Sequence, residues 1–133
     1  MTMPAGRYYI GDMCYVMHNE WAEFCELTMP NNQCLDGEFV LADGRRFATY
    51  GTAYGDGTYQ SNIGTSHSVD AGLIGCIRVE DIRDNTYEDI ERLGAIVTFN
   101  QPFEVGEDHG LICFGHVHIE TAGSYEAEEY EYE

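Results

Sequence analysis

The sequence predicts an α+β domain that is mainly antiparallel β, with a partly closed or barrel-like sheet and two short helices. Short apolar segments are separated by turn pairs such as Asp43-Gly44, and two segments instead have helical periodicity. With 133 residues, of which 44% are hydrophobic, the chain is long enough for one folded core. We expect a single compact domain over residues 1–122, followed by an acidic, tyrosine-rich tail over residues 123–133.

The first segments of the chain predict a pair of β-strands. Residues 7–10 and 13–17 have strand composition. Gly11-Asp12 lies between them and has the composition of a tight turn. We therefore expect a β-hairpin or a bent strand pair near the N-terminus.

A short helix is expected next, over residues 20–29. Its apolar residues recur three and four positions apart, so Trp21 and Phe24 share one face and are expected in the core. Asn19 is the expected N-cap, and Pro30 begins the segment that ends the helix.

The middle of the chain predicts further β-structure. Residues 37–51 alternate about the Asp-Gly turn and give the clearest hairpin pattern. Residues 51–68 predict a long loop or a second, irregular hairpin. Residues 68–79 predict a strand in which Gly72 and Gly75 indicate a bulge or a close approach of neighbouring backbone.

The last third predicts a helix and then strands. Residues 85–93 are the second expected helix, with Asn85 as its cap and Gly94 at its end. Residues 95–99 are expected to form a buried strand, and residues 103–120 a final hairpin.

Charge is the strongest signal in the composition. The chain has 24 acidic residues against 6 basic ones, for a net charge of −18, and every base is an arginine. Such a chain repels nucleic acids and anionic membranes, which disfavours direct binding to either. It attracts basic protein surfaces, including those that normally hold nucleic acid. The alternative is that the acidity serves only solubility or adaptation to salt.

The acids concentrate in three places where we expect a basic partner to bind. These are the end of the strand at 68–79, the second predicted helix, and the tail. In the tail, tyrosines alternate with glutamates and provide aromatic anchors beside negative charge. The expected partner-binding residues are Glu80, Asp81, Asp84, Glu88, Asp89, Glu91, Glu126, Glu128 and Glu129.

One strand near the C-terminus carries a candidate metal site. His116, His118 and Glu120 alternate with Val117 and Ile119, so the polar residues are expected to share one face. Two imidazoles and a carboxylate form a reasonable ligand set for a divalent metal, although a further histidine from elsewhere is needed. The alternative is a solvated sheet face opposite a core face, because that arrangement needs the same alternation.

Three arginines, Arg45, Arg46 and Arg78, lie near turns or strand ends. A few arginines within an acidic shell form a selective anion pocket, and tyrosines such as Tyr8 and Tyr59 provide stacking faces. A small-molecule site for a nucleotide-like ligand is therefore the alternative to simple ion pairing of these arginines with the abundant acids.

No pattern in the sequence identifies a reaction. Asp56 lies between two glycines and Asp70 lies two residues before Gly72, where they suit either acid–base chemistry or an ordinary turn. The 5 cysteines are odd in number and irregularly spaced, which favours reduced thiols over a disulfide framework or a zinc site. Cys14 and Cys113 each have a histidine nearby in the sequence, but that proximity does not supply a catalytic base. We therefore expect a protein that is not an enzyme. The alternative is a metal- or small-molecule-binding β domain, either sequestering or enzymatic, that uses the His116, His118 and Glu120 face or the pocket of arginines and tyrosines.

The segments YIGDxCYV, ADGRRFA, YGDGxY and VDAGxIGC resemble a group of small uncharacterised proteins of tailed phages and some bacteria, across residues 7–82. The resemblance implies a viral protein in the host cytoplasm, and that group of proteins offers no catalytic residues to carry over to this chain. The N-terminus also lacks a basic segment followed by an apolar one, so no signal peptide is expected. The leading hypothesis is a small acidic phage-type protein that binds and blocks a basic host protein with a role in nucleic-acid handling or defence.

Overall fold

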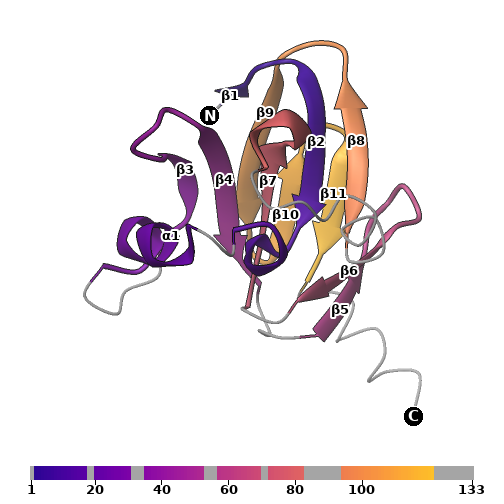
Figure 1. Ribbon diagram of the computed structural model, residues 1–133. Helices are drawn as coiled ribbons and strands as arrows, with labels where there is room; N and C mark the ends of the chain where they lie inside the picture. The colour runs from indigo at the N-terminus through magenta and orange to yellow at the C-terminus, as the bar shows by residue number, and fades with distance from the viewer. Residues whose placement is uncertain are drawn as a thin grey trace.

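The computed structural model describes residues 2–17, 20–30, 35–52, 57–69, 72–82 and 94–121. They form mainly antiparallel β-structure with one α-helix at its side, α1 (Trp21–Thr28), and with 3-10 turns η1 (Met13–Tyr15) and η3 (Val79–Asp81) (Figure 1). The strands are β1 (Thr2–Met3), β2 (Gly6–Gly11), β3 (Gly37–Val40), β4 (Arg46–Gly51), β5 (Gly57–Gln60), β6 (Ser66–Val69), β7 (Leu73–Arg78), β8 (Ala95–Phe99), β9 (Phe103–Asp108), β10 (Leu111–Phe114) and β11 (Val117–Glu120).

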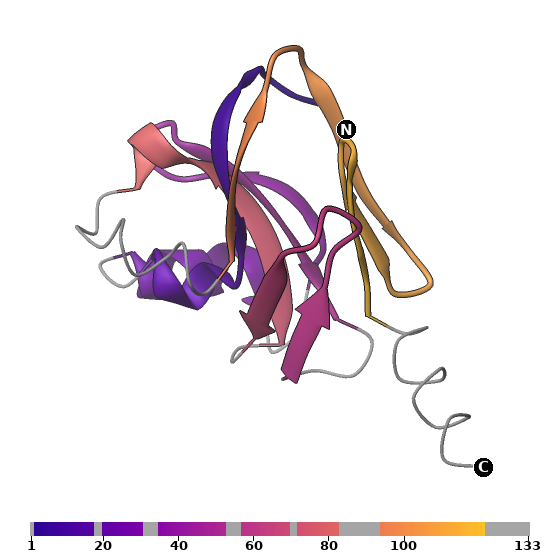
Figure 2. The same cartoon turned by 90° about the vertical axis from the view of Figure 1, so that its right-hand side faces the viewer.

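The strands form two sheets and a two-stranded ribbon. One sheet has the order β3-β4-β7-β2-β8, the other has the order β1-β9-β10-β11, and β5 pairs with β6. Figure 2 shows the two sheets converging at one end, where β1 leads into β2 and β8 leads into β9, while the β5–β6 ribbon lies toward the other end. The described strands therefore form separate sheets and not a closed barrel. The second expected helix, residues 85–93, lies outside the described residues.

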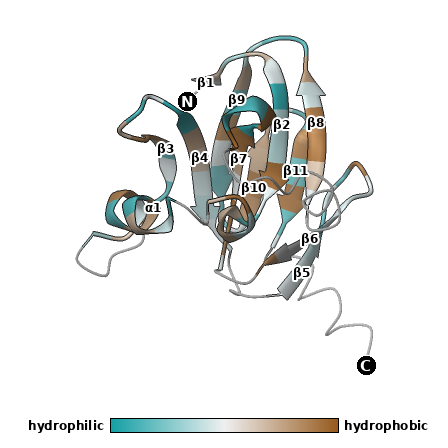
Figure 3. Cartoon of the chain, in the orientation of Figure 1, coloured by the Kyte–Doolittle hydropathy of each residue, from teal (hydrophilic) through white to brown (hydrophobic). Residues whose placement is uncertain are grey.

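Two apolar clusters hold these layers together. The larger lies between the sheets and the ribbon, and the smaller lies between the five-stranded sheet and α1 with η1. Strand β2 contributes to both, because Tyr8 and Ile10 face the first cluster and Tyr9 faces the second. Figure 3 shows the corresponding bands of hydrophobic colour along β8 and the strands beside it.

Gly75, in the centre of β7, permits this packing. A Cβ atom there would collide with the backbone carbonyl of Ala48 and lie 2.9 Å from the side chain of Met13. The expectation of close backbone approach at Gly75 is thus confirmed. Gly72 lies just before β7 with a φ of 75°, in the region that favours glycine.

The expected N-terminal strand pair is wrong in its second half. β2 runs through Gly11, and the residues after it form η1 instead of a strand. Asp12 explains the change, because its buried side chain accepts a hydrogen bond of 2.9 Å from the backbone N–H of Cys14 and caps the 3-10 turn. β2 instead pairs with β7 and β8.

The first helix is confirmed, but its start and its aromatic face differ from expectation. Glu20 occupies the N-cap position without a capping side-chain bond, and Asn19 lies outside the described residues. Phe24 is fully buried, as expected, whereas Trp21 is only half-buried. Trp21 begins the helix and stacks on Phe24 with ring centroids 4.8 Å apart, so one side of its indole faces outward.

The remaining hairpins follow the sequence in part. The β3–β4 hairpin turns at Gly44, which has a φ of 96°, and β5 pairs with β6 as the irregular hairpin. Residues 103–120 form a three-stranded meander and not one hairpin, because Gly110 and Gly115 each allow a reversal. β8 is a half-buried edge strand and not a fully buried one, since Thr98 is exposed.

Candidate functional site

The candidate metal residues are only partly brought together. In β11, Val117 and Ile119 are fully buried, His118 is exposed and Glu120 is half-buried, so the expected alternation is present. His116 lies in the turn before β11, and its ring packs against Phe99 with centroids 5.4 Å apart.

Possible further ligands lie elsewhere. His67 is buried and engaged in other hydrogen bonds, and His109 is exposed with Nδ1 2.6 Å from the carboxylate of Asp108. Within the described residues, no group of three histidine, cysteine or acidic side chains is arranged to hold a metal ion. His18 lies outside these residues.

The described cysteines have the character of structural thiols. Cys14, Cys25, Cys76 and Cys113 are free, and Cys34 lies outside the described residues. Burial raises the pKa of the Cys76 thiol strongly. Burial also raises the pKa of Cys113, and the nearby charges of Asp108 and Glu120 raise it further. A thiol with a raised pKa stays protonated near neutral pH and is a weak nucleophile, so neither Cys76 nor Cys113 has the character of a catalytic cysteine.

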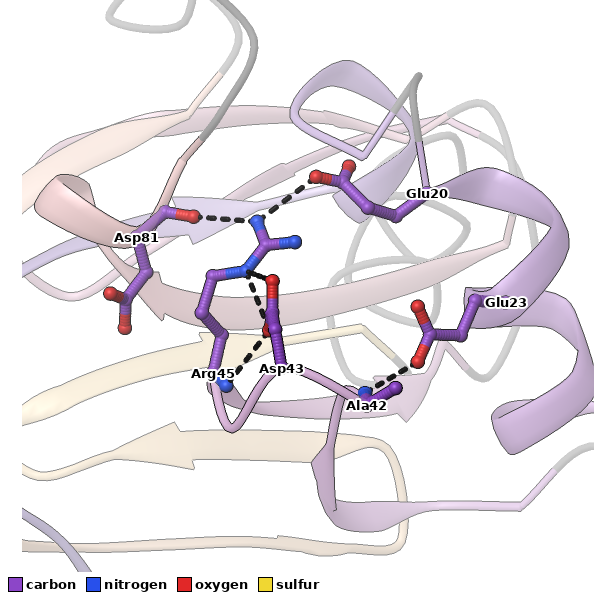
Figure 4. Close-up of polar contacts among 6 residues, drawn as sticks. All are labelled: Glu20, Glu23, Ala42, Asp43, Arg45 and Asp81. Carbon is purple, nitrogen blue, oxygen red and sulfur yellow. Dashed lines mark hydrogen bonds and ion pairs between the residues drawn. The ribbon is translucent and has the colours of Figure 1, made fainter.

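Arg45 serves as an internal clamp between three segments of the fold. Its guanidinium lies 2.9 Å from Glu20 at the start of α1, 2.8 Å from Asp43 in the β3–β4 turn, and 3.0 Å from the carbonyl of Asp81 in η3 (Figure 4). Glu23 adds a second tie to the same turn, because its carboxylate accepts a 2.6 Å bond from the N–H of Ala42.

The clamp keeps Arg45 charged. Burial alone lowers the pKa of the guanidinium, but its hydrogen bonds to Asp43 and Glu20 outweigh that effect, and the net pKa is raised. Arg45 is only 9% exposed, so its charge is neutralised inside the fold and is not available to a ligand. The expected pocket built on three arginines therefore lacks Arg45.

Arg46 and Arg78 lie apart from this clamp, on the opposite face of the same sheet. β4 directs Ala48 and Tyr50 into the larger cluster, and the alternation along the strand sends Arg46 to that side too. Arg78 follows Ile74 and Cys76 on β7 in the same way. Of the expected tyrosines, Tyr8 lines a pocket with these two arginines, whereas Tyr59 lies on β5 and does not line it.

The expected partner-binding acids fall mostly outside the described residues. Glu80 is exposed and Asp81 is half-buried, both in η3. The others lie in the undescribed segments: Asp84, Glu88, Asp89, Glu91, Glu126, Glu128 and Glu129. Asp56 and Asp70 are also outside the described residues.

His67 is a site that the sequence reasoning did not place. It is fully buried, its Nδ1–H donates to the carbonyl of Ile10 at 3.1 Å, and its Nε2 lies 2.8 Å from the hydroxyl of Thr65. Burial lowers its pKa to about 4. The available signal was its alternation with Val69 on β6, because both side chains then face the core.

Comparison with known proteins provides no relative whose function could be compared with that of this chain. No protein-family model, no curated protein and no solved structure matches the sequence or the fold. None of the helical segments in the described residues combines the length and apolar character needed to cross a membrane. The described residues contain antiparallel β-sheets and one short helix, and two of their arginines, Arg45 and Arg46, pair with carboxylates of the same chain.

Proposed function

We propose that this protein is a non-enzymatic binding protein whose acidic surface engages a basic patch on a partner protein. The carboxylates take the place of nucleic-acid phosphates, so that binding blocks the partner's own site. The observation that carries this proposal is the imbalance of exposed charge. Among the described residues, Arg7 is the exposed arginine, whereas the exposed acids are Glu26, Asp36, Asp43, Glu80, Glu104, Glu107 and Asp108.

Two of the other described arginines are paired with carboxylates of the same chain, which adds to this imbalance. Arg45 is neutralised by Glu20 and Asp43, and Arg46 pairs with Glu38. Carboxylates of the same chain neutralise these positive charges. The two arginines therefore do not offset the other acids, which give the chain its net charge of −18. A field of one sign accelerates encounter with an oppositely charged partner and weakens as salt rises.

The contact region that we propose begins at Glu80 and Asp81 in η3. It continues through the acidic segment that follows and includes the tyrosine- and glutamate-rich tail. η3 lies directly after β7, a central strand of the five-stranded sheet, so the first of these acids stand on a firmly held element. The partner is a nucleic-acid-handling or defence-related bacterial protein and the setting is the host cytoplasm, both taken from the resemblance to phage proteins.

Retention of a partner from bacterial lysate on immobilised protein tests the proposal, with nucleic acid removed beforehand. We expect a nucleic-acid-binding protein to be retained at about 50 mM salt and released at about 300 mM, and to be displaced by added DNA. Glu80→Gln with Asp81→Asn, or deletion of residues 124–133, should each weaken retention. Glu104→Gln with Glu107→Gln on β9 is the matched control, because it removes the same number of negative charges from the other sheet.

Three results would contradict the proposal. One is the absence of any salt-sensitive partner, which is what acidity for solubility alone predicts. Another is a partner that DNA does not displace. The third is an equal loss of retention in the β9 control, which would show that net charge matters and the η3 region does not.

A further inference from the structure

Arg46 and Arg78 lie directly opposite each other on neighbouring strands. β4 pairs with β7 in a register that aligns Phe47 with Ile77, so the next residue on each strand, Arg46 and Arg78, also face each other. Tyr8 of β2 lies opposite Arg78 on its other side. Opposite residues point to the same face of a sheet, and like charges placed in this way destabilise it. The fold therefore holds two guanidiniums and a phenol in one row.

This row has a structural role at the corner that joins β1 to β2. Its side chains donate to backbone carbonyls of residues 2–5, at 3.0 Å for Arg46, 2.7 Å for Tyr8 and 2.6 Å for Arg78. These bonds hold the corner but bring no negative charge, because a carbonyl is neutral. They also use only one nitrogen, Nη2, of each guanidinium.

The two arginines differ in how their charge is balanced. Arg46 pairs with the carboxylate of Glu38. Arg78 has no carboxylate partner within the described part of the chain, and its Nε is buried without a hydrogen-bond acceptor. Nε is out of reach of solvent, so a ligand that balances the charge of Arg78 has to bind at the part of its guanidinium that lines a pocket.

An open pocket of about 140 Å³ lies at the row. Arg46, Arg78, Tyr8 and Asp81 provide its polar lining, together with Met3, Pro4 and Gly44. Pockets for drug-sized ligands measure about 300 to 1,000 Å³, so this one suits a single compact group. Gly6 leaves room for the guanidinium, because a Cβ there would lie 3.1 Å from Nε of Arg78.

We propose that this pocket binds a phosphate group that keeps a proton, either inorganic phosphate or the terminal group of a small phosphomonoester. The oxygens accept from the guanidiniums of Arg46 and Arg78 on the side that lines the pocket, and their negative charge separates the two positive charges. The inference goes beyond the proposed partner binding, because it concerns a small ligand and a pair of arginines instead of the acidic surface.

Asp81 is the reason for choosing a protonated phosphate over other anions. A carboxylate in the lining repels a fully ionised oxyanion, but it accepts a hydrogen bond from a phosphate P–OH. Phosphate monoesters have their second pKa near 6, so a proton remains on a substantial fraction of them around that pH. Sulfate is tetrahedral and of similar size but has no such proton, and it is the matched probe.

Binding is measured by NMR of the full chain at pH 6, with inorganic phosphate, phenyl phosphate and sulfate titrated separately. We expect saturable shifts of the Arg78 Nε–H signal with phosphate below about 10 mM, and affinity for sulfate lower by about tenfold, which corresponds to about 1.4 kcal/mol. Saturation by phenyl phosphate as well assigns the site to terminal phosphate groups, and saturation by inorganic phosphate alone assigns it to the free ion.

Three variants complete the test. Asp81→Asn should bring sulfate binding close to that of phosphate, and Arg78→Lys should abolish saturable binding of both. Arg7→Gln, an exposed arginine on the other face of β2, should change neither affinity. If Arg78→Lys does not fold, the ratio of phosphate to sulfate affinity in Asp81→Asn decides alone. Equal affinities in the wild type, a ratio unchanged in Asp81→Asn, or no saturation by either phosphate overturns the proposal.

Discussion

As the pH falls, protonation of His67 should destabilise the fold before most carboxylates are protonated. His67 joins the β5–β6 ribbon to the five-stranded sheet, through its Nδ1–H bond to the carbonyl of Ile10. That bond fixes the neutral tautomer, so Nε2 must accept from the hydroxyl of Thr65. Protonation of Nε2 forces the Thr65 hydroxyl to accept instead of donate, and it puts a charge at a fully buried site.

The sign and size of the effect follow from the pKa. Burial lowers the pKa of His67 from the ordinary 6.5 to about 4, so the unfolded chain binds the extra proton first as pH falls. Stability is therefore fully present above pH 6.5 and decreases as pH drops toward 4. The whole shift corresponds to about 3 kcal/mol, of which about 2 kcal/mol is lost between pH 7 and pH 5. Most carboxylates remain ionised over that interval.

Urea unfolding of the wild type and of His67→Gln at several pH values measures this contribution. Subtracting the variant's free energies removes the opposing gain from reduced self-repulsion of a chain with net charge −18. We expect the difference to shrink by about 2 kcal/mol from pH 7 to pH 5. A constant difference, or an NMR titration of the His67 ring centred near 6.5, would refute the reasoning. The NMR titration uses the wild type and serves even if the variant does not fold.

Two further predictions concern the packing. Gly75→Ala should destabilise the fold by about 2–3 kcal/mol in urea unfolding, because its Cβ meets the backbone of Ala48, whereas Gly106→Ala, with no atom within 4 Å of its Cβ, should be neutral or slightly stabilising. Equal effects would show that β7 can move away from β4. Phe24→Ala should cost about 3–5 kcal/mol and Trp21→Ala only about 1–2 kcal/mol, because the first ring is fully buried and the second half-buried. Thermal or urea unfolding compares them, and the reverse order would contradict the placement of α1.

Local patterns in the sequence were enough to predict several elements. The Asp43-Gly44 turn and the alternation of Val117 with Ile119 were both confirmed. Hairpin turns and strand faces depend on residues within a few positions of each other, and that information is present in any short stretch of chain. The net charge likewise needs no structure, and it determines which surfaces repel the protein.

Local patterns failed where the composition of a segment fitted more than one structure. The segment after Gly11 had strand composition, but the buried side chain of Asp12 capped a 3-10 turn, and β2 paired with β7 and β8 instead. The same limit applies to the meander formed by residues 103–120, where composition alone did not show that Gly115 reverses the chain a second time.

The candidate site depended on tertiary structure almost entirely. Arg45 and Arg46 are adjacent in the sequence, yet one is clamped by Glu20 and Asp43 and the other joins Arg78 across the sheet. The sequence alone determined that this is an acidic, β-rich chain whose bases are all arginine. Only strand register decided which arginines meet, because register is set by pairing between segments far apart in the chain, and a shift of one residue would turn each side chain to the opposite face.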